Sequence, residues 1–133
     1  MVDDNSLGLQ ARKAVLEELG HCVTAAGSVE DAMELLVAGP SFDIVITDYK
    51  LPGMTGSDLI HEILKRKLPV HTVLLSGFVD ALGLNEANTG ADVVLQKSSQ
   101  ELSHLVRSVK ALLRKRKPAG AEPGPADMER KRA

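Results

Sequence analysis

The chain alternates between short continuous apolar runs and longer stretches whose apolar residues recur at helical spacing. Continuous runs lie at residues 42–48, 70–76 and 92–96, and a shorter one lies at 22–25. A strand that is apolar at successive positions is buried on both faces, as in a parallel sheet. These runs therefore predict buried strands, and Cys22 is expected to be a small core residue of the shortest one.

Between these runs, apolar residues recur every three or four positions, which predicts amphipathic helices. The stretches concerned are 6–19, 28–37, 57–64, 79–88 and 98–113. Ser28, Ser57 and Ser98 stand at the starts of three of them, and Glu101 would complete a capping box with Ser98. Gly83 lies inside the fourth stretch and weakens that prediction, because glycine disfavours helix interiors.

Strands that alternate with helices form a parallel sheet covered on both faces by right-handed crossovers. The pattern therefore predicts a doubly wound α/β fold. Ligands of such folds bind at the carboxyl ends of the strands.

The composition fits one such domain. The chain has 133 residues, 44% of them hydrophobic and 2% aromatic, so aliphatic side chains must build the core. The net charge of -2 argues neither for nor against nucleic acid. A single cysteine allows neither an internal disulfide nor a zinc site, which fits a reducing compartment.

The chain also shows no targeting or membrane signal. No run reaches the roughly 18 to 20 apolar residues of a membrane span, and no basic segment precedes an apolar stretch at the N-terminus. We therefore expect a cytoplasmic domain without a membrane span.

The C-terminal residues differ from the rest. Basic runs at 114–117 and 129–132 flank a stretch rich in proline, glycine and alanine. This composition lacks apolar periodicity, so we expect residues 118–133 to be a mobile charged tail. Such basic runs usually keep a tail solvated, and no direct nucleic-acid binding is expected.

Polar side chains that can carry chemistry stand where the strands end. Asp48 and Ser76 end two of the predicted strands, Lys97 stands at the end of a third, and Asp3 and Asp4 stand where a first strand would end. Because carboxyl ends of parallel strands share one edge, we expect all five side chains to meet there.

Such a cluster suits phosphoryl transfer. Crowded carboxylates repel each other, and Mg²⁺, which prefers oxygen ligands, relieves this repulsion. A carboxylate can be the nucleophile that forms an aspartyl phosphate, and the metal neutralises charge on the phosphoryl group. Lys97 and Ser76 could donate to phosphoryl oxygens.

Each residue also has an ordinary interpretation. An acidic pair suits a helix N-terminus, Asp48 and Ser76 suit turns, and Lys97 suits an exposed surface. Their joint placement at strand ends favours a chemical site.

These residues and their surroundings closely resemble the CheY-like receiver family of response regulators over residues 1–117. The acidic pair, Asp48, Ser76 and Lys97 match the family pattern, as do residues 47–56 and 90–92. The resemblance implies a five-stranded parallel sheet of order 2-1-3-4-5 with five helices, and residues 1–117 as one receiver domain.

The resemblance also implies the function. Asp48 would accept phosphate from a phosphohistidine of a sensor histidine kinase or histidine phosphotransfer protein. Asp4, Asp48 and the backbone carbonyl of Lys50 would ligate Mg²⁺ or Mn²⁺, with Asp3 acting through water. Lys97 would bridge the carboxylate and the phosphoryl group, and Ser76 would bind a phosphoryl oxygen.

Three positions depart from the family pattern. Val94 replaces an aromatic residue whose rotation reports phosphorylation, and Ser98 replaces a proline, so we expect a trans Lys97–Ser98 bond. Only Met1 and Val2 remain of the first strand. The chain could start further upstream, the sheet could tolerate a stub, or a second copy could lend a strand in a homodimer. We favour the first.

Several functions remain open. The leading hypothesis is a phosphoacceptor switch whose purpose is regulatory rather than enzymatic. A haloacid-dehalogenase-type phosphatase is disfavoured, since Lys50 stands where that chemistry needs a second aspartate. The chain could also be the receiver of a hybrid sensor kinase, because residues 74–78 resemble the same stretch in receivers attached to such kinases. A third possibility, a phosphorylation-independent interaction module, is disfavoured by the intact site.

Overall fold

The structure is a computed structural model that describes residues 1–115. Three strands form a parallel sheet in the order β1-β2-β3, namely β1 (Ile44–Asp48), β2 (His71–Ser76) and β3 (Val93–Gln96). The predicted tail at 118–133 lies outside the described residues. The parallel α/β arrangement is as predicted.

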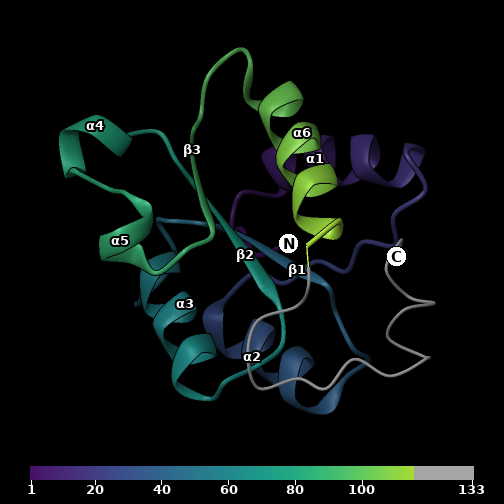
Figure 1. Ribbon diagram of the computed structural model, residues 1–133, viewed down its shortest axis with the longest axis vertical. Coiled ribbons are helices and arrows are strands. Elements are labelled where there is room, and N and C mark those ends of the chain that lie inside the picture. The colour runs from purple at the N-terminus through teal and green to yellow at the C-terminus, as the bar shows by residue number, and fades with distance from the viewer. Residues whose placement is uncertain (116–133) are drawn as a thin grey trace.

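Helices cover both faces of the sheet (Figure 1). They are α1 (Ser6–Glu18), α2 (Val29–Ala38), α3 (Gly56–Lys65), α4 (Val79–Leu82), α5 (Glu86–Thr89) and α6 (Glu101–Leu113). α1 and α6 lie together on one face, and α2 and α3 lie together on the other. No helix in the described part of the chain is long and apolar enough to cross a membrane.

The core has one apolar layer on each side of the sheet. Between the sheet and the α1–α6 pair lie buried aliphatic residues, among them Leu16, Ile46, Val73, Leu75, Leu105, Val109 and Leu112. The opposite layer contains Val2, Ala26, Val29, Ala32, Val45, Leu59 and Ile63. Each fully buried Val, Leu or Ile side chain contributes about 1.5–3 kcal/mol, so the two layers hold the strand ends in fixed positions.

The first strand of the expected order is present only as a stub at Val2. The Val2 N–H donates to Ile46 O at 2.8 Å, and Val2 O accepts from Asp48 N at 2.9 Å. On the other side, Asp3 N donates to Ala26 O at 3.0 Å. Val2 thus lies between Ala26 and β1, where strand one of the order 2-1-3-4-5 belongs, and the upstream start stays a prediction.

The prediction for residues 22–25 is wrong in detail. Ala26 forms an isolated parallel bridge with Val2, and no strand is assigned at 22–25. Cys22 is exposed rather than buried. The neighbouring stub is too short to form a ladder, and its one bond to residues 22–25 runs from the Met1 amino group to Thr24 O at 2.8 Å.

Two predicted helix caps are also wrong, and one is confirmed. Ser28 Oγ accepts from Asp31 N at 3.1 Å, as expected. Thr55 rather than Ser57 caps α3, in a reciprocal capping box with Asp58. The last helix begins at Glu101 and has no side-chain cap, since Ser98 Oγ accepts from Gln100 N before the helix and Glu101 pairs with Arg12.

Two further local expectations have clear outcomes. The stretch 79–88 forms two short helices, since Gly83 adopts a left-handed conformation with φ 65° and ends α4. The Lys97–Ser98 bond is trans, as predicted, since the described residues contain no cis peptide bond.

Candidate functional site

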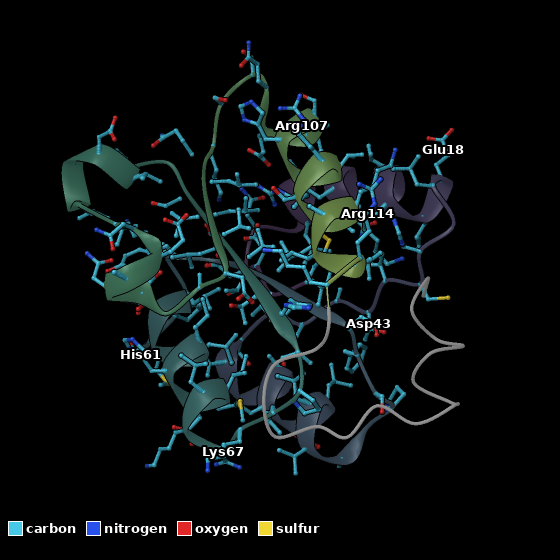
Figure 2. The ribbon with its side chains drawn as sticks, in the orientation of Figure 1. Glu18, Asp43, His61, Lys67, Arg107 and Arg114 are labelled. Atoms are coloured by element: carbon cyan, nitrogen blue, oxygen red, sulfur yellow. The ribbon has the colours of Figure 1, made fainter. Side chains whose placement is uncertain are left out.

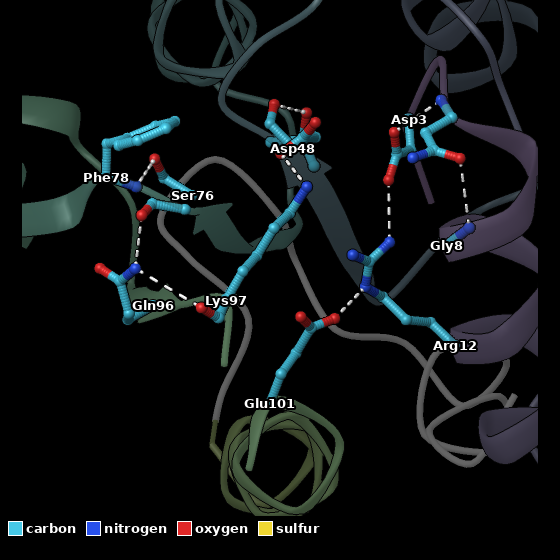
Figure 3. A network of polar contacts seen from close by, with 12 residues as sticks. Asp3, Gly8, Arg12, Asp48, Ser76, Phe78, Gln96, Lys97 and Glu101 are labelled. Carbon is cyan, nitrogen blue, oxygen red and sulfur yellow. Dashed lines mark hydrogen bonds and ion pairs between the residues drawn. The ribbon is translucent and has the colours of Figure 1, made fainter. Parts of the chain in front are cut away.

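The predicted site residues converge at the carboxyl edge of the sheet. Asp48 ends β1, Ser76 ends β2 and Lys97 directly follows β3. Asp3 follows the Val2 bridge, and Figure 3 shows Asp3, Asp48, Ser76 and Lys97 in one neighbourhood. Their meeting follows from the parallel register of the strands.

Three carboxylates form an acidic cluster in this neighbourhood. Carboxylate oxygens of Asp3, Asp4 and Asp48 all lie within 4.8 Å of one another. Asp3 and Asp48 are buried and Asp4 is exposed. Oxygen donors at this spacing fit a hard divalent cation that keeps some of its water, such as Mg²⁺.

Lys97 reaches across the site to Asp48. Its Nζ lies 2.7 Å from Asp48 Oδ1, and its backbone N–H donates to Ser76 O at 2.8 Å. Burial raises the pKa of the Asp48 carboxyl above its ordinary value, Lys97 opposes this shift, and Asp3 adds to it. Burial therefore destabilises the ionised form of Asp48, and additional positive charge nearby would stabilise it.

Ser76 lies at the end of β2 and is 3% exposed. Its Oγ accepts a hydrogen bond from Phe78 N at 3.0 Å, so the hydroxyl is tied to the following loop. Gln96, which sequence reasoning missed, holds the same loop from β3. Its Nε2 donates to Gly77 O at 2.6 Å and its Oε1 accepts from Val79 N at 3.0 Å.

The loop after Asp48 is folded tightly against the start of α3. Lys50 bridges to Thr55, and Gly56 N donates to Tyr49 O at 2.7 Å. A Cβ at Gly56 would lie 2.2 Å from Asp48 O, so this close approach requires glycine. The loop thereby fixes the backbone around Asp48 and Lys50.

Arg12 is a second site residue that sequence reasoning missed. It is 5% exposed, and its Nη1 donates to Asp3 Oδ2 at 2.8 Å. Arg12 lies between Leu9 and Leu16 on the buried face of α1. A charged residue in such an apolar stripe needs a buried partner, so this position could have identified Arg12 from the sequence.

Comparison with known proteins identifies the family. A family model for the response regulator receiver domain matches residues 1–110. The chain belongs to the response regulator receiver domain family. It is accordingly a receiver domain of the kind found in two-component signalling, and the family is that of regulatory phosphoacceptors.

Curated relatives of this receiver domain include whole regulators and parts of larger proteins. It is 30% identical over 114 residues to the two-component response regulator ORR42 of Oryza sativa, covering 84% of this chain and 85% of that protein. It is 38% identical over 66 residues to the aerobic respiration control sensor protein ArcB of Escherichia coli. That match covers 50% of this chain and 8% of ArcB, so the chain spans only a small part of the sensor protein.

Solved receiver structures share the fold. The response regulator TrrA of Thermotoga maritima, in complex with Mg²⁺ and BeF, is 28% identical with a TM-score of 0.72. The match covers 84% of this chain and 94% of that chain. TrrA in complex with the histidine kinase ThkA is likewise 28% identical, with a TM-score of 0.73 over the same shares of both chains.

Proposed function

We propose that this receiver domain accepts a phosphoryl group on Asp48. The observation that carries the proposal is the 2.7 Å contact of Lys97 Nζ with Asp48 Oδ1 beside two further carboxylates. An Asp48 oxygen attacks the phosphorus of a phosphohistidine, a P–O bond forms and the P–N bond breaks. The imidazole nitrogen keeps the electron pair of that bond and takes a proton, and Asp48 becomes an acyl phosphate.

Each neighbouring residue has a role in this transfer. Asp4, Asp48 and the backbone carbonyl of Lys50 would hold Mg²⁺ or Mn²⁺, with Asp3 acting through water. The bound metal would supply positive charge to the phosphoryl oxygens. Lys97 contributes a second positive charge from the β3 side, and Ser76 donates its hydroxyl to a phosphoryl oxygen.

The same groups assist both the transfer of the phosphoryl group to Asp48 and the slow hydrolysis of the acyl phosphate. The chemistry therefore serves regulation. The phosphoryl donor is a sensor histidine kinase or a histidine phosphotransfer protein. The TrrA–ThkA complex supports a kinase partner, because TrrA shares this fold at 28% identity. We further propose that the domain comprises residues 1–117, works in the cytoplasm and binds no nucleic acid directly.

A second candidate is a receiver that belongs to a hybrid sensor kinase. The match to one small part of the sensor protein ArcB supports it. Both candidates share the chemistry at Asp48. A module that acts without phosphate, or through homodimers alone, would not need the intact acidic cluster and Lys97 contact.

Phosphorylation starts a change at the loop after β2. Ser76 Oγ now accepts from Phe78 N, and turning toward a phosphoryl oxygen would strain this bond and move the loop that leads into α4. Val94 packs against the buried cluster of Ile60, Leu74 and Ala91 and has no ring to rotate. Crystal structures with and without beryllofluoride should show a moved 76–79 loop and an unchanged Val94 environment; a repacked Val94 contradicts this step.

The test of the proposal is labelling of the whole chain with acetyl phosphate and Mg²⁺. Intact mass should show one added phosphoryl group in the wild type and in Asp31→Asn, a matched change at an exposed aspartate of α2. Asp48→Asn should take up none, and chelation of the metal should abolish labelling. Labelling that persists in Asp48→Asn would mean that another residue is the acceptor.

A further inference from the structure

A buried network links the acidic cluster to the start of α6. Arg12 projects from α1 between Asp3 and Glu101, as Figure 3 shows. Its Nη1 lies 2.8 Å from Asp3 Oδ2, and its Nε lies 2.5 Å from Glu101 Oε2. The side chain of Arg12 is 6% exposed, that of Asp3 is 4% exposed and that of Glu101 is 15% exposed. The network is therefore largely shielded from water, where charges interact strongly.

Asp3 belongs to this network and to the acidic cluster at once. Its Oδ1 accepts from Asn5 N at 2.8 Å while its Oδ2 accepts from Arg12. Both carboxylate oxygens are thus oriented by donors, and one of these donors carries a full positive charge. That charge also acts on Asp48, whose pKa Arg12 shifts downward.

Glu101 is the other end of the network and the first residue of α6. The N-cap residue Gln100 makes no side-chain hydrogen bond to the helix. The Arg12–Glu101 pair therefore ties the first turn of α6 to α1. The helix dipole also favours a carboxylate at this position.

We propose that Arg12 is a positioning residue of the metal site and that, through Glu101, it couples the charge bound at this site to the first turn of α6. A divalent cation takes up negative charge that Asp3 otherwise offers to Arg12. The ion pair between the buried guanidinium and Glu101 then becomes stronger, and the first turn of α6 is held more tightly. Such coupling is reciprocal, so Glu101 must also influence how strongly the cation binds. The inference rests on the proposed metal site.

The sharpest variant is Glu101→Gln, which removes the charge but keeps the shape and an oxygen that can accept from Arg12. Arg12 then directs its full charge toward Asp3 and the entering cation. Calorimetric titration of the whole chain with MgCl₂ should show binding weakened on the order of threefold to tenfold. Glu101→Asp, which returns the negative charge, should restore the affinity toward the wild-type value.

The matched control is Glu30→Gln, which makes the same change in the first turn of α2 at an exposed position. It should leave Mg²⁺ affinity unchanged. Amide hydrogen exchange gives a second readout: Mg²⁺ should slow exchange at His104 and Leu105 in the wild type but not in Glu101→Gln.

Equal Mg²⁺ affinity in the wild type and Glu101→Gln would overturn the coupling, as would an equal loss in Glu30→Gln. Failure of the metal site itself is distinguished by Asp4→Asn. If Asp4→Asn leaves Mg²⁺ binding unchanged, the proposed metal site is wrong. If it abolishes binding while Glu101→Gln has no effect, only the coupling through Arg12 is wrong.

Discussion

Asp48 is a carboxylate held where its charge is poorly solvated. It is 8% exposed and lies beside Asp3, and its pKa is raised chiefly by burial. The Lys97 ammonium offsets part of this cost. A poorly solvated carboxylate is stabilised by any process that adds positive charge nearby or removes its negative charge. Asp48 therefore suits a site that binds a cation and a phosphoryl group.

Asp48→Asn should therefore make the fold more stable at neutral pH. A pKa raised in the folded state means that ionisation disfavours folding as pH increases above the ordinary value of 3.8. We expect the melting temperature of the variant at pH 7 to exceed that of the wild type by on the order of a few degrees. The difference should vanish in acid, where both states of the wild type are protonated. Asp31→Asn is the control, and a variant less stable than the wild type at pH 7 would contradict the argument.

The elements were predicted well where their apolar patterns were long. β2 and α6 lie where the apolar run and the helical stripe placed them, because burial on the sheet fixes both periodicities. The residue at which a helix begins was less predictable, as α3 shows. Thr55 and Ser57 are both good caps, and the choice depends on Asp58 and on where α3 meets the backbone of Asp48.

Gly56→Ala tests the close contact between the start of α3 and Asp48 at the end of β1. The added Cβ would lie 2.2 Å from Asp48 O and 3.0 Å from Asp48 C, so the backbone must move. We expect a loss of about 1–3 kcal/mol in the free energy of unfolding, measured by urea denaturation, and slower labelling by acetyl phosphate.

Gly27→Ala is the matched control, since a Cβ there meets nothing within 4 Å. It should leave both stability and labelling nearly unchanged. Equal effects at the two glycines would show that helix or loop propensity, rather than the contact with Asp48, sets the cost.

At the scale of the molecule, Val2 links the segment at Ala26 to the edge strand β1 of the sheet. Val2 bridges Ala26 on one side and Thr47 on the other, and its side chain is 3% exposed in the layer beneath α2 and α3. It also leads directly into Asp3. The stub therefore sets the position of the acidic cluster relative to Asp48.

Val2→Ala should cost about 2 kcal/mol of stability, because it removes buried methyl groups while leaving the backbone bonds in place. Val37→Ala makes the same change at a side chain that is 58% exposed, and it should change stability by less than about 0.5 kcal/mol. Chemical denaturation of both variants measures the difference. A similar small effect at both positions would mean that the stub contributes little to the fold.

The sequence by itself determined the alternation of strands and helices, the family and the gathering of acidic residues, Asp48, Ser76 and Lys97 at one edge. These follow from local periodicity and from the rule that parallel strands end on the same side. Only the tertiary structure decided that Val2 lies between Ala26 and β1, that Gln96 holds the 76–79 loop and that Arg12 joins Asp3 to Glu101. The physical reason is that these contacts join residues far apart in the chain, and their charges and hydrogen bonds become defined only when packing brings the partners together.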